Sequence, residues 1–213
     1  MPAIVSIVGK SKSGKTTLIE KLIRELKSRN YRVATVKHTV EEAVLDTPGK
    51  DTWRHLQAGS EATVLGSENG ILLIKPAASG TILDEIVRLL GEDYDIILAE
   101  GFKQGDAPKI EVHRKAAGPP LKDIKKLVAI VTDEPLETKT RQFSLEDVKG
   151  LADLLEEGFI RPQSDRLSLY VNDAPIPLSS FPREFVTNVL LAMVSSLKGV
   201  AKINSLKLFL KKR

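Results

Sequence analysis

Residues 9–16, close to the start of the chain, read Gly-Lys-Ser-Lys-Ser-Gly-Lys-Thr and fill the pattern G-x-x-x-x-G-K-[ST] without a mismatch. The six residues before them, 3–8, form an apolar, β-branched run typical of a buried parallel strand. After them, apolar residues recur at helical spacing from Leu18 to Leu26. Because strand, glycine loop and helix follow in the required order, the segment predicts a loop that binds nucleotide phosphates.

Each residue type in this loop has a physical task. Gly9 and Gly14 permit backbone conformations in which several N–H groups point into one concavity. The following helix adds unpaired N–H donors and the positive end of its dipole. We expect Lys15 to reach the β- and γ-phosphates, and the hydroxyl of Thr16 to ligate Mg²⁺. The predicted nucleotide-binding segment consists of Gly9, Lys10, Ser11, Lys12, Ser13, Gly14, Lys15, Thr16 and Thr17. Two interpretations of Lys10 and Lys12 stay open: exposure to solvent, or extra charge near the phosphates or across a dimer.

Composition narrows the class of protein. A chain of 213 residues with 42% hydrophobic content is long enough to bury a full core. The absence of cysteine excludes disulfides, thiol catalysis and thiolate metal sites. Since no apolar stretch approaches membrane-spanning length, we expect neither a membrane segment nor a secretory signal, and a cytoplasmic location. The net charge is +4, and basic residues gather near the end of the chain without interleaved aromatics, which favours a solvated surface over a nucleic-acid site.

Strand and helix patterns alternate along the first three quarters of the chain. Further strands are predicted at 32–37, 63–65, 71–74, 95–99, 109–113 and 127–132, with helices at 51–58, 81–90 and from about 145 to Phe159. Asn69-Gly70 is a favoured hairpin turn, and Ser144 with Asp147 three residues on predicts the cap of the last helix. The alternation predicts an α/β fold: a three-layer sandwich of the P-loop NTPase type, with a mostly parallel sheet and a β-hairpin insertion.

Residues 1–162 are predicted to form this nucleotide-binding domain, and residues 163–213 a small α+β appendage. In the appendage we expect a strand at 167–171, a turn at 172–175, a helix at 182–198 and a final strand at 206–210. The apolar face of that helix is expected to be core or dimer interface rather than a ligand site. Its members are Phe185, Val186, Val189, Leu190, Met193, Val194 and Leu197.

Ligands of parallel sheets bind at the carboxyl ends of the strands, so polar residues just past each strand are candidates. Glu100 follows a buried strand where a carboxylate would support Mg²⁺ and polarise the attacking water. Lys37 and His38 end another strand, and His38 alone is as consistent with a hydrogen-bonded surface group as with a catalyst. Asp51 either belongs to a switch segment near the γ-phosphate or caps a helix. Thr132 and Asp133 follow a third strand, where the carboxylate would accept from N1 and N2 of guanine or belong to a plain turn.

Taken together, these segments resemble the MobB family, the molybdopterin-guanine dinucleotide biosynthesis adapter proteins. The matching segments occur in the family's order over about residues 3–160. They are Gly9–Thr17, Val36–Thr39, Asp46–Asp51, Ala58-Gly59, Glu100–Lys103, Lys109-Ile110, Arg114, Thr132-Asp133 and Asp147–Asp153. The Glu-Gly-Phe-Lys and Pro-Gly-Lys-Asp elements are far more particular than a phosphate loop alone.

The resemblance implies a homodimeric GTP-binding protein with weak intrinsic GTPase activity. Its implied partners are the molybdenum cofactor guanylyltransferase, which joins GMP to molybdopterin, and the pterin cofactor or a molybdoenzyme apoprotein; no nucleic acid and no membrane are implied. GTP and Mg²⁺ would be the cofactors, with Glu100 supporting the metal. Lys103, Lys109 and Arg114 match family positions beside the same cleft and would offer positive charge to an anion. The hairpin 63–74 would be a dimer element because its exposed edges need covering.

The chain departs from the family pattern in two places. Only His38 can be carried over from a region where family members often have more histidines, and the appendage lies beyond the matched segments. Alternatives to an adapter GTPase are a phosphotransferase with Asp51 or His38 as base, a dimeric ATPase suggested by Lys10, and a scaffold that binds no nucleotide. Since no glutamine is placed to orient water and no arginine finger is identifiable, we expect slow hydrolysis.

Overall fold

The computed structural model describes residues 2–39, 46–76, 82–163, 167–172, 174–208 and 210. The chain divides into two compact units, Pro2–Ser164 and Asp165–Arg213. Within the described residues, no helix has both the length and the apolar character needed to cross a membrane.

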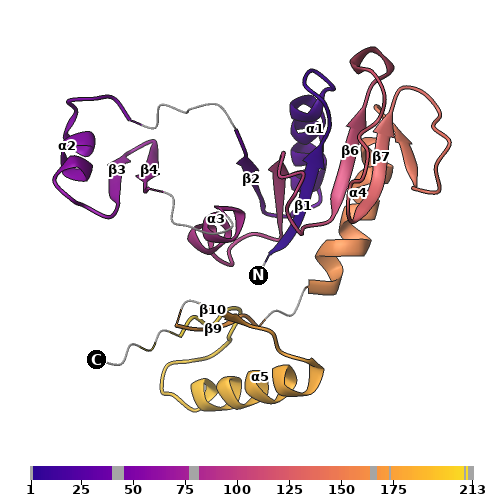
Figure 1. Cartoon of the computed structure of the whole chain (residues 1–213). Helices are drawn as coiled ribbons and strands as arrows, with labels where there is room; N and C mark the ends of the chain where they lie inside the picture. Colours follow the sequence, from indigo (N-terminus) through magenta and orange to yellow (C-terminus); the bar gives the residue numbers. More distant parts are fainter. Residues whose placement is uncertain are drawn as a thin grey trace. The chain divides into compact units, whose positions relative to one another are not determined.

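The larger unit is built on a six-stranded sheet in the order β2-β5-β1-β6-β7-β8, in which every neighbouring pair is parallel. Its strands are β1 (Ala3–Val8), β2 (Val33–Lys37), β5 (Ile96–Glu100), β6 (Lys109–His113), β7 (Leu127–Thr132) and β8 (Gln142–Ser144). Because parallel neighbours need crossover connections, helices lie on the faces of the sheet (Figure 1). The predicted α/β fold with a mostly parallel sheet is confirmed; the short strand β8 had not been predicted.

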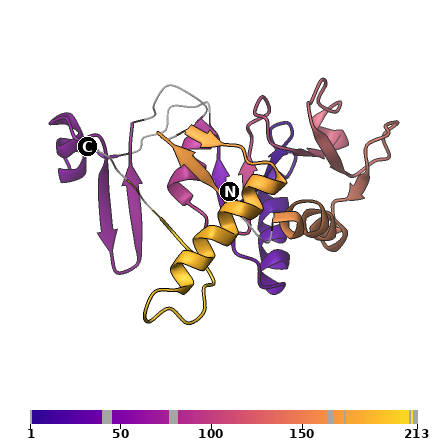
Figure 2. The same cartoon turned by 90° about the horizontal axis from the view of Figure 1, so that it is seen from below.

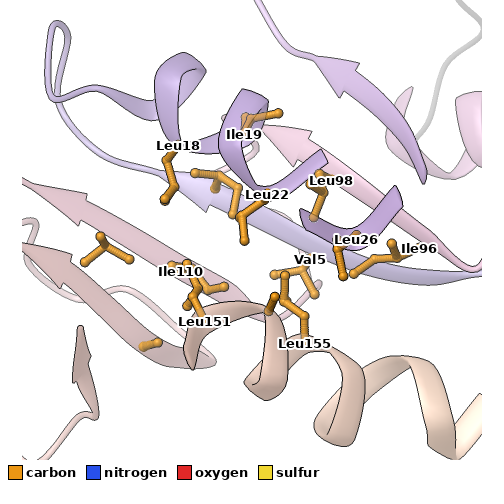
Figure 3. Packing of buried hydrophobic residues seen from close by; sticks show 14 of the residues in the cluster. Val5, Leu18, Ile19, Leu22, Leu26, Ile96, Leu98, Ile110, Leu151 and Leu155 are labelled. Carbon is orange, nitrogen blue, oxygen red and sulfur yellow. The ribbon is translucent and has the colours of Figure 1, made fainter. Parts of the chain in front are cut away.

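One face of the sheet is covered by α1 (Lys15–Ser28) and α4 (Val148–Leu155). Figure 3 shows the apolar side of α1 pointing onto the strands, with two leucines of α4 beside it. The cluster includes Val5, Leu18, Ile19, Leu22, Leu26, Ile96, Leu98, Ile110, Leu151 and Leu155, all buried. Burial of such side chains contributes about 1.5–3 kcal/mol each, which fixes α1 and the loop before it on the sheet.

An ion cluster fastens the far end of α1 to α4. The guanidinium of Arg29 lies 2.6 Å from Asp153 and 2.9 Å from Glu156, and it also pairs with Glu25 in its own helix at 2.8 Å. Hydrogen bonds from Arg29 hold the pKa of Glu156 below its usual value. The helix α1 is therefore held by its apolar packing on the sheet and, at its C-terminal end, by the ion pairs of Arg29. After α4 the chain continues through a π-helical turn at Glu156–Ile160 and a 3₁₀ turn at Arg161–Gln163.

The opposite face of the sheet is apolar on one half and polar on the other. Over β2 and β5, the helix α3 (Ile82–Leu90) packs Leu83 and Val87 against buried alanine, valine and isoleucine side chains. On β6, by contrast, Lys109, Glu111 and His113 are all buried.

A separate two-stranded ribbon follows a short helix between β2 and α3. The helix α2 spans Asp51–Gln57, and β3 (Thr63–Ser67) pairs antiparallel with β4 (Gly70–Ile74), as Figure 2 shows. The predicted hairpin is present, but its turn is Glu68-Asn69 rather than Asn69-Gly70, because Ser67 pairs directly with Gly70. Five apolar side chains of the ribbon are exposed: Val64, Leu65, Ile71, Leu72 and Leu73.

The smaller unit contains β9 (Leu169–Val171), β10 (Ala174–Ile176) and α5 (Ser180–Ser195), and Figures 1 and 2 both show the strand pair beside α5. The chain reverses between Val171 and Ala174, as expected, but Ala174 and Pro175, which were assigned to the turn, belong to β10. Residues 206–208 and 210 form no strand, so that prediction was wrong for the part described. None of the side chains of α5 is buried, which contradicts the core interpretation of its apolar face; Phe185, Val189, Met193 and Leu197 are exposed, and the dimer-interface interpretation stays a prediction.

The cap of α4 is Asp147, not Ser144. The carboxylate of Asp147 accepts a hydrogen bond of 3.0 Å from the backbone N–H of Gly150, three residues into the turn. Ser144 is the last residue of β8, and its backbone carbonyl accepts from the N–H of Asp147. The sequence prediction paired the right residues but assigned the cap to the wrong one.

Asp147→Ala should lower the free energy of unfolding by about 1 kcal/mol, since it leaves the first-turn N–H groups of α4 without their side-chain acceptor. Ser144→Ala is the matched control and should leave stability unchanged within about 0.5 kcal/mol. Urea denaturation of both variants measures the difference. Equal losses in the two variants, or the larger loss in Ser144→Ala, would contradict this cap assignment.

Candidate functional site

The glycine loop between β1 and α1 is folded by its own backbone. A β-carbon on Gly9 would collide with the backbone oxygen of Val112 in β6, so the close approach of the neighbouring strand requires glycine. Lys12 and Gly14 both adopt left-handed conformations, with φ of 60° and 95°. Left-handed residues of this kind are typical of loops whose successive N–H groups form an anion-binding concavity at a helix N-terminus, the position of this loop before α1.

Lys15 lies across this concavity. Its ammonium donates to the backbone carbonyls of Lys10 at 2.7 Å and Gly9 at 3.3 Å. Burial lowers the pKa of Lys15, nearby Glu100 opposes that shift, and Lys103 and Lys37 add to it. An anion placed beside this ammonium would favour its charged form and so oppose the lowering of its pKa.

Thr16, the first residue after Lys15, contacts Glu100. Its hydroxyl lies 3.1 Å and 3.3 Å from the two carboxylate oxygens of Glu100. Glu100 is the last residue of β5 and stands level with Ile7 of β1 in the sheet, which brings these side chains together from positions 84 residues apart. A hydroxyl and a carboxylate are oxygen donors that suit Mg²⁺, which commonly takes one or two protein ligands and completes its shell with water and phosphate oxygens. Among the described residues, no cluster of three or more His, Asp or Glu side chains offers an all-protein metal site.

The carboxyl end of β2 lies beside that of β5. Lys37 is directly level with Glu100, and the N–H of His38 donates to the carbonyl of Glu100 at 3.0 Å. The imidazole of His38 packs 4.8 Å from the ring of Phe102, centre to centre. Phe102 has a φ of 53°, unusual for a bulky residue, so the chain turns sharply after Glu100 and brings Lys103 within electrostatic reach of Lys15.

Arg114 approaches the loop from the other side. It follows β6, and its Nε donates to the carbonyl of Ser13 at 3.2 Å. A β-carbon at position 14 would lie 3.4 Å from that Nε, so Gly14 also leaves room for the guanidinium. No carboxylate forms an ion pair with Arg114 among the residues the structure describes. The phosphate loop is thus flanked by Lys37 and Lys103 on one side and Arg114 on the other.

Thr132 and Asp133 form a rigid corner after β7. The hydroxyl of Thr132 donates to the carbonyl of Glu134 at 2.8 Å, and Oδ1 of Asp133 accepts from the N–H of Lys115 at 2.8 Å. Lys115 opens the 3₁₀ turn Lys115–Ala117. The side chain of Asp133 is exposed, so the corner presents it to solvent at the carboxyl end of the sheet.

Two predicted residues are not brought to the loop by any described contact. Lys109 is fully buried, burial lowers its pKa, and its ammonium donates to the carbonyls of Gly105 and Ala107 rather than facing a ligand. Asp51 is exposed at the start of α2, with Arg54 3.8 Å away. It does not cap α2, whose N-cap is Lys50.

The sequence analysis overlooked two buried polar residues of β6, Glu111 and His113. Glu111 accepts from the N–H of Leu121 at 2.7 Å, and His113 lies 3.0 Å from Glu134. Their signal is the alternation Lys-Ile-Glu-Val-His in residues 109–113. That alternation is typical of a half-exposed strand, whereas β6 lies in the middle of the sheet and is buried throughout.

The fold and this loop define a class of α/β proteins: a parallel sheet with a glycine-rich turn between β1 and the following helix α1, and a hydroxyl–carboxylate pair beside that turn. Comparison with known proteins narrows the class. The family model described as molybdopterin guanine dinucleotide synthesis protein B, MobB, matches residues 4–133. The chain belongs to this family.

Curated relatives agree with that assignment. A molybdopterin-guanine dinucleotide biosynthesis adapter protein of Haemophilus influenzae is 36% identical over 155 residues, 72% of this chain and 87% of the relative. The adapter protein of Escherichia coli is 32% identical and covers 74% of this chain and 93% of its own length. A putative adapter protein of Methanocaldococcus jannaschii is 27% identical over 96% of this chain and 95% of its own, so this archaeal relative has a counterpart to most of the smaller unit.

Solved structures carry the same fold. A crystal structure of molybdopterin-guanine biosynthesis protein B gives a TM-score of 0.59 at 28% identity, covering 72% of this chain and 98% of that one. The crystal structure of Bacillus subtilis MobB gives a TM-score of 0.57 at 26% identity, covering 74% and 98%.

Gly14→Ala should lower the free energy of unfolding by about 1–2 kcal/mol, because alanine is strained at a φ of 95°. Gly66→Ala is the matched control: its surroundings are open and its φ is not left-handed, so stability should stay within about 0.5 kcal/mol. Thermal and urea denaturation measure the change in stability of both variants. If Gly14→Ala left the free energy of unfolding unchanged, the loop would not adopt this conformation.

Proposed function

We propose that this protein is a GTP-binding adapter with slow GTPase activity that acts in the formation of molybdopterin guanine dinucleotide. The adapter role is taken from the relatives, whose names describe biosynthesis adapters of that dinucleotide. The observation that best supports the nucleotide part is the contact of Thr16 with Glu100 at 3.1 Å next to Lys15, within a loop of phosphate-binding conformation.

The residues of the loop have distinct tasks in this proposal. The inward N–H groups and the ammonium of Lys15 hold the β- and γ-phosphates, and Thr16 and Glu100 hold Mg²⁺, which neutralises charge on the phosphate oxygens when bound. Lys37, Lys103 and Arg114 surround the same concavity and add positive charge. Lys10, Ser11, Lys12, Ser13 and Thr17 complete the phosphate-binding segment. Hydrolysis is slow because no residue is identified that orients the attacking water.

Guanine recognition is assigned to the corner after β7. Oδ1 of Asp133 accepts one hydrogen bond, from the N–H of Lys115; because each carboxylate oxygen can accept two, both oxygens can still accept from a base edge. A carboxylate pairs with N1–H and the 2-amino group of guanine, whereas adenine offers no such pair of donors. Thr132 anchors the corner through its contact with Glu134.

Assembly is also part of the proposal. The ribbon β3–β4 exposes five apolar side chains and two strand edges, a surface suited to pairing with a second copy of the chain. The proposed partners are the enzyme that joins GMP to molybdopterin and the pterin cofactor or the molybdoenzyme apoprotein that receives it. An adapter needs a nucleotide-dependent conformation more than rapid turnover.

Lys15→Ala should abolish GTP binding, because it removes the cation that lies across the phosphate concavity. Glu100→Gln should keep binding within a few-fold but reduce Mg²⁺-dependent hydrolysis by about 10²-fold, since the amide supports the metal poorly. Calorimetry and phosphate-release assays measure the two effects. Undiminished hydrolysis in Glu100→Gln would remove the metal assignment, and GTP binding by Lys15→Ala would remove the loop assignment.

Asp133→Asn should exchange the base preference from guanine to xanthine. The carboxamide can donate to the second carbonyl of xanthine, but it no longer accepts from the 2-amino group of guanine. Titrations with GTP and XTP measure the ratio of the two affinities, which should change by about 10²-fold or more. Asp123→Asn, an exposed aspartate elsewhere in the same unit, is the control. An unchanged ratio in Asp133→Asn would show that another residue reads the base.

A further inference from the structure

The strand β6 buries three polar side chains on one face of the sheet. Lys109, Glu111 and His113 are only 0%, 2% and 3% exposed, while the residues between them, Ile110 and Val112, belong to the apolar core on the other face. Burying such groups costs free energy that apolar side chains would not cost. A strand selected for stability alone would carry valine or isoleucine at these positions, so their contacts should explain them.

Lys109 acts on the loop that leaves β5. Its ammonium donates to the carbonyls of Gly105 and Ala107, at 2.9 Å for the latter. The loop spans residues 101–108, begins directly after Glu100 and carries Lys103. Backbone hydrogen bonds pin its two ends to β1, while Lys109 holds its middle from inside.

His113 acts on the corner after β7. Its Nε2 lies 3.0 Å from Oε1 of Glu134, and since a carboxylate only accepts, the imidazole donates. Glu134 is also within 3.7 Å of the ammonium of Lys115. Because Glu134 follows Asp133 directly, this contact fixes the orientation of the corner that presents Asp133.

Glu111, between the two, holds a third segment. Its Oε1 accepts from the N–H of Leu121, at the end of the stretch that begins with Arg114 on the phosphate loop. The three side chains therefore reach three different loops around the phosphate concavity. Each loop contains one of the charged residues assigned above: Lys103, Arg114 or Asp133.

We propose that β6 is a positioning strand whose buried polar side chains hold separate ends of the nucleotide site, Lys109 the phosphate and metal end and His113 the base end. The proposal rests on the function proposed above and deepens it. These residues touch no substrate; they act through the loops they hold. It also gives Lys109 a role other than the anion contact that the sequence suggested.

The test separates the two ends. In Lys109→Met, Mg²⁺-dependent hydrolysis of GTP should fall by about tenfold or more while the ratio of GTP to ATP affinity stays unchanged. In His113→Leu, that ratio should fall by about tenfold while hydrolysis at saturating GTP stays within twofold. His113→Gln keeps an N–H donor for Glu134 and should restore most of the base preference. Ile110→Val, on the opposite face of β6, is the control for simple destabilisation and should alter neither quantity.

Two results would overturn the proposal. One is a parallel loss of hydrolysis and base preference in both variants, which is the mark of general destabilisation; the other is the absence of any change in either folded variant. Thermal unfolding establishes that each variant is folded. If Lys109→Met does not fold, the comparison of His113→Leu with His113→Gln still tests the proposal. Failure of the proposed function is distinguishable, because the unsubstituted protein would then show no preference for GTP over ATP at all.

Discussion

The positions of the candidate residues around the loop depend on the parallel pairing of β1 with β5 on one side and with β6 on the other. In register, Ile7 stands level with Glu100, and Glu100 with Lys37, so three strands end at one edge of the sheet. The phosphate loop leaves the sheet at that edge, and β6 approaches it so closely that Gly9 can carry no side chain. The apolar packing beneath α1 keeps the N-terminus of the helix over this edge, as Figure 3 shows.

Charge is distributed unevenly around that edge. Lysines and an arginine converge on the loop, and one carboxylate, Glu100, contacts it through Thr16. Burial lowers the pKa of Lys15, Glu100 opposes that shift, and repulsion by Lys103 and Lys37 adds to it; the negative charge of a bound polyphosphate would oppose the shift. The surplus of positive charge is what a triphosphate site needs. The polar face of β6 adds the internal contacts that hold the flanking loops.

Sequence reasoning located the parts of this site that are local in the chain. The loop, the strands β1, β6 and β7 and the position of Glu100 at the end of β5 follow from patterns within a few residues. The assignment of the α4 cap to Ser144 instead of Asp147 was a local error. What the sequence could not supply was tertiary: that Lys109 faces inward and that Arg114 donates to the backbone of the loop. Such facts depend on which strand becomes central, and an alternating strand such as residues 109–113 does not reveal that. In the smaller unit, helix periodicity predicted α5 but not the exposure of its apolar side chains.

The most direct test of the account is calorimetric titration of the unsubstituted protein with non-hydrolysable GTP and ATP analogues, each with and without Mg²⁺. The account predicts saturable, Mg²⁺-dependent binding of the GTP analogue and at least tenfold weaker binding of the ATP analogue. Equal affinity for both analogues, or a preference for ATP, would contradict the guanine assignment and favour an ATPase or a phosphotransferase. Absence of binding to either would contradict the central claim that this loop is a nucleotide site.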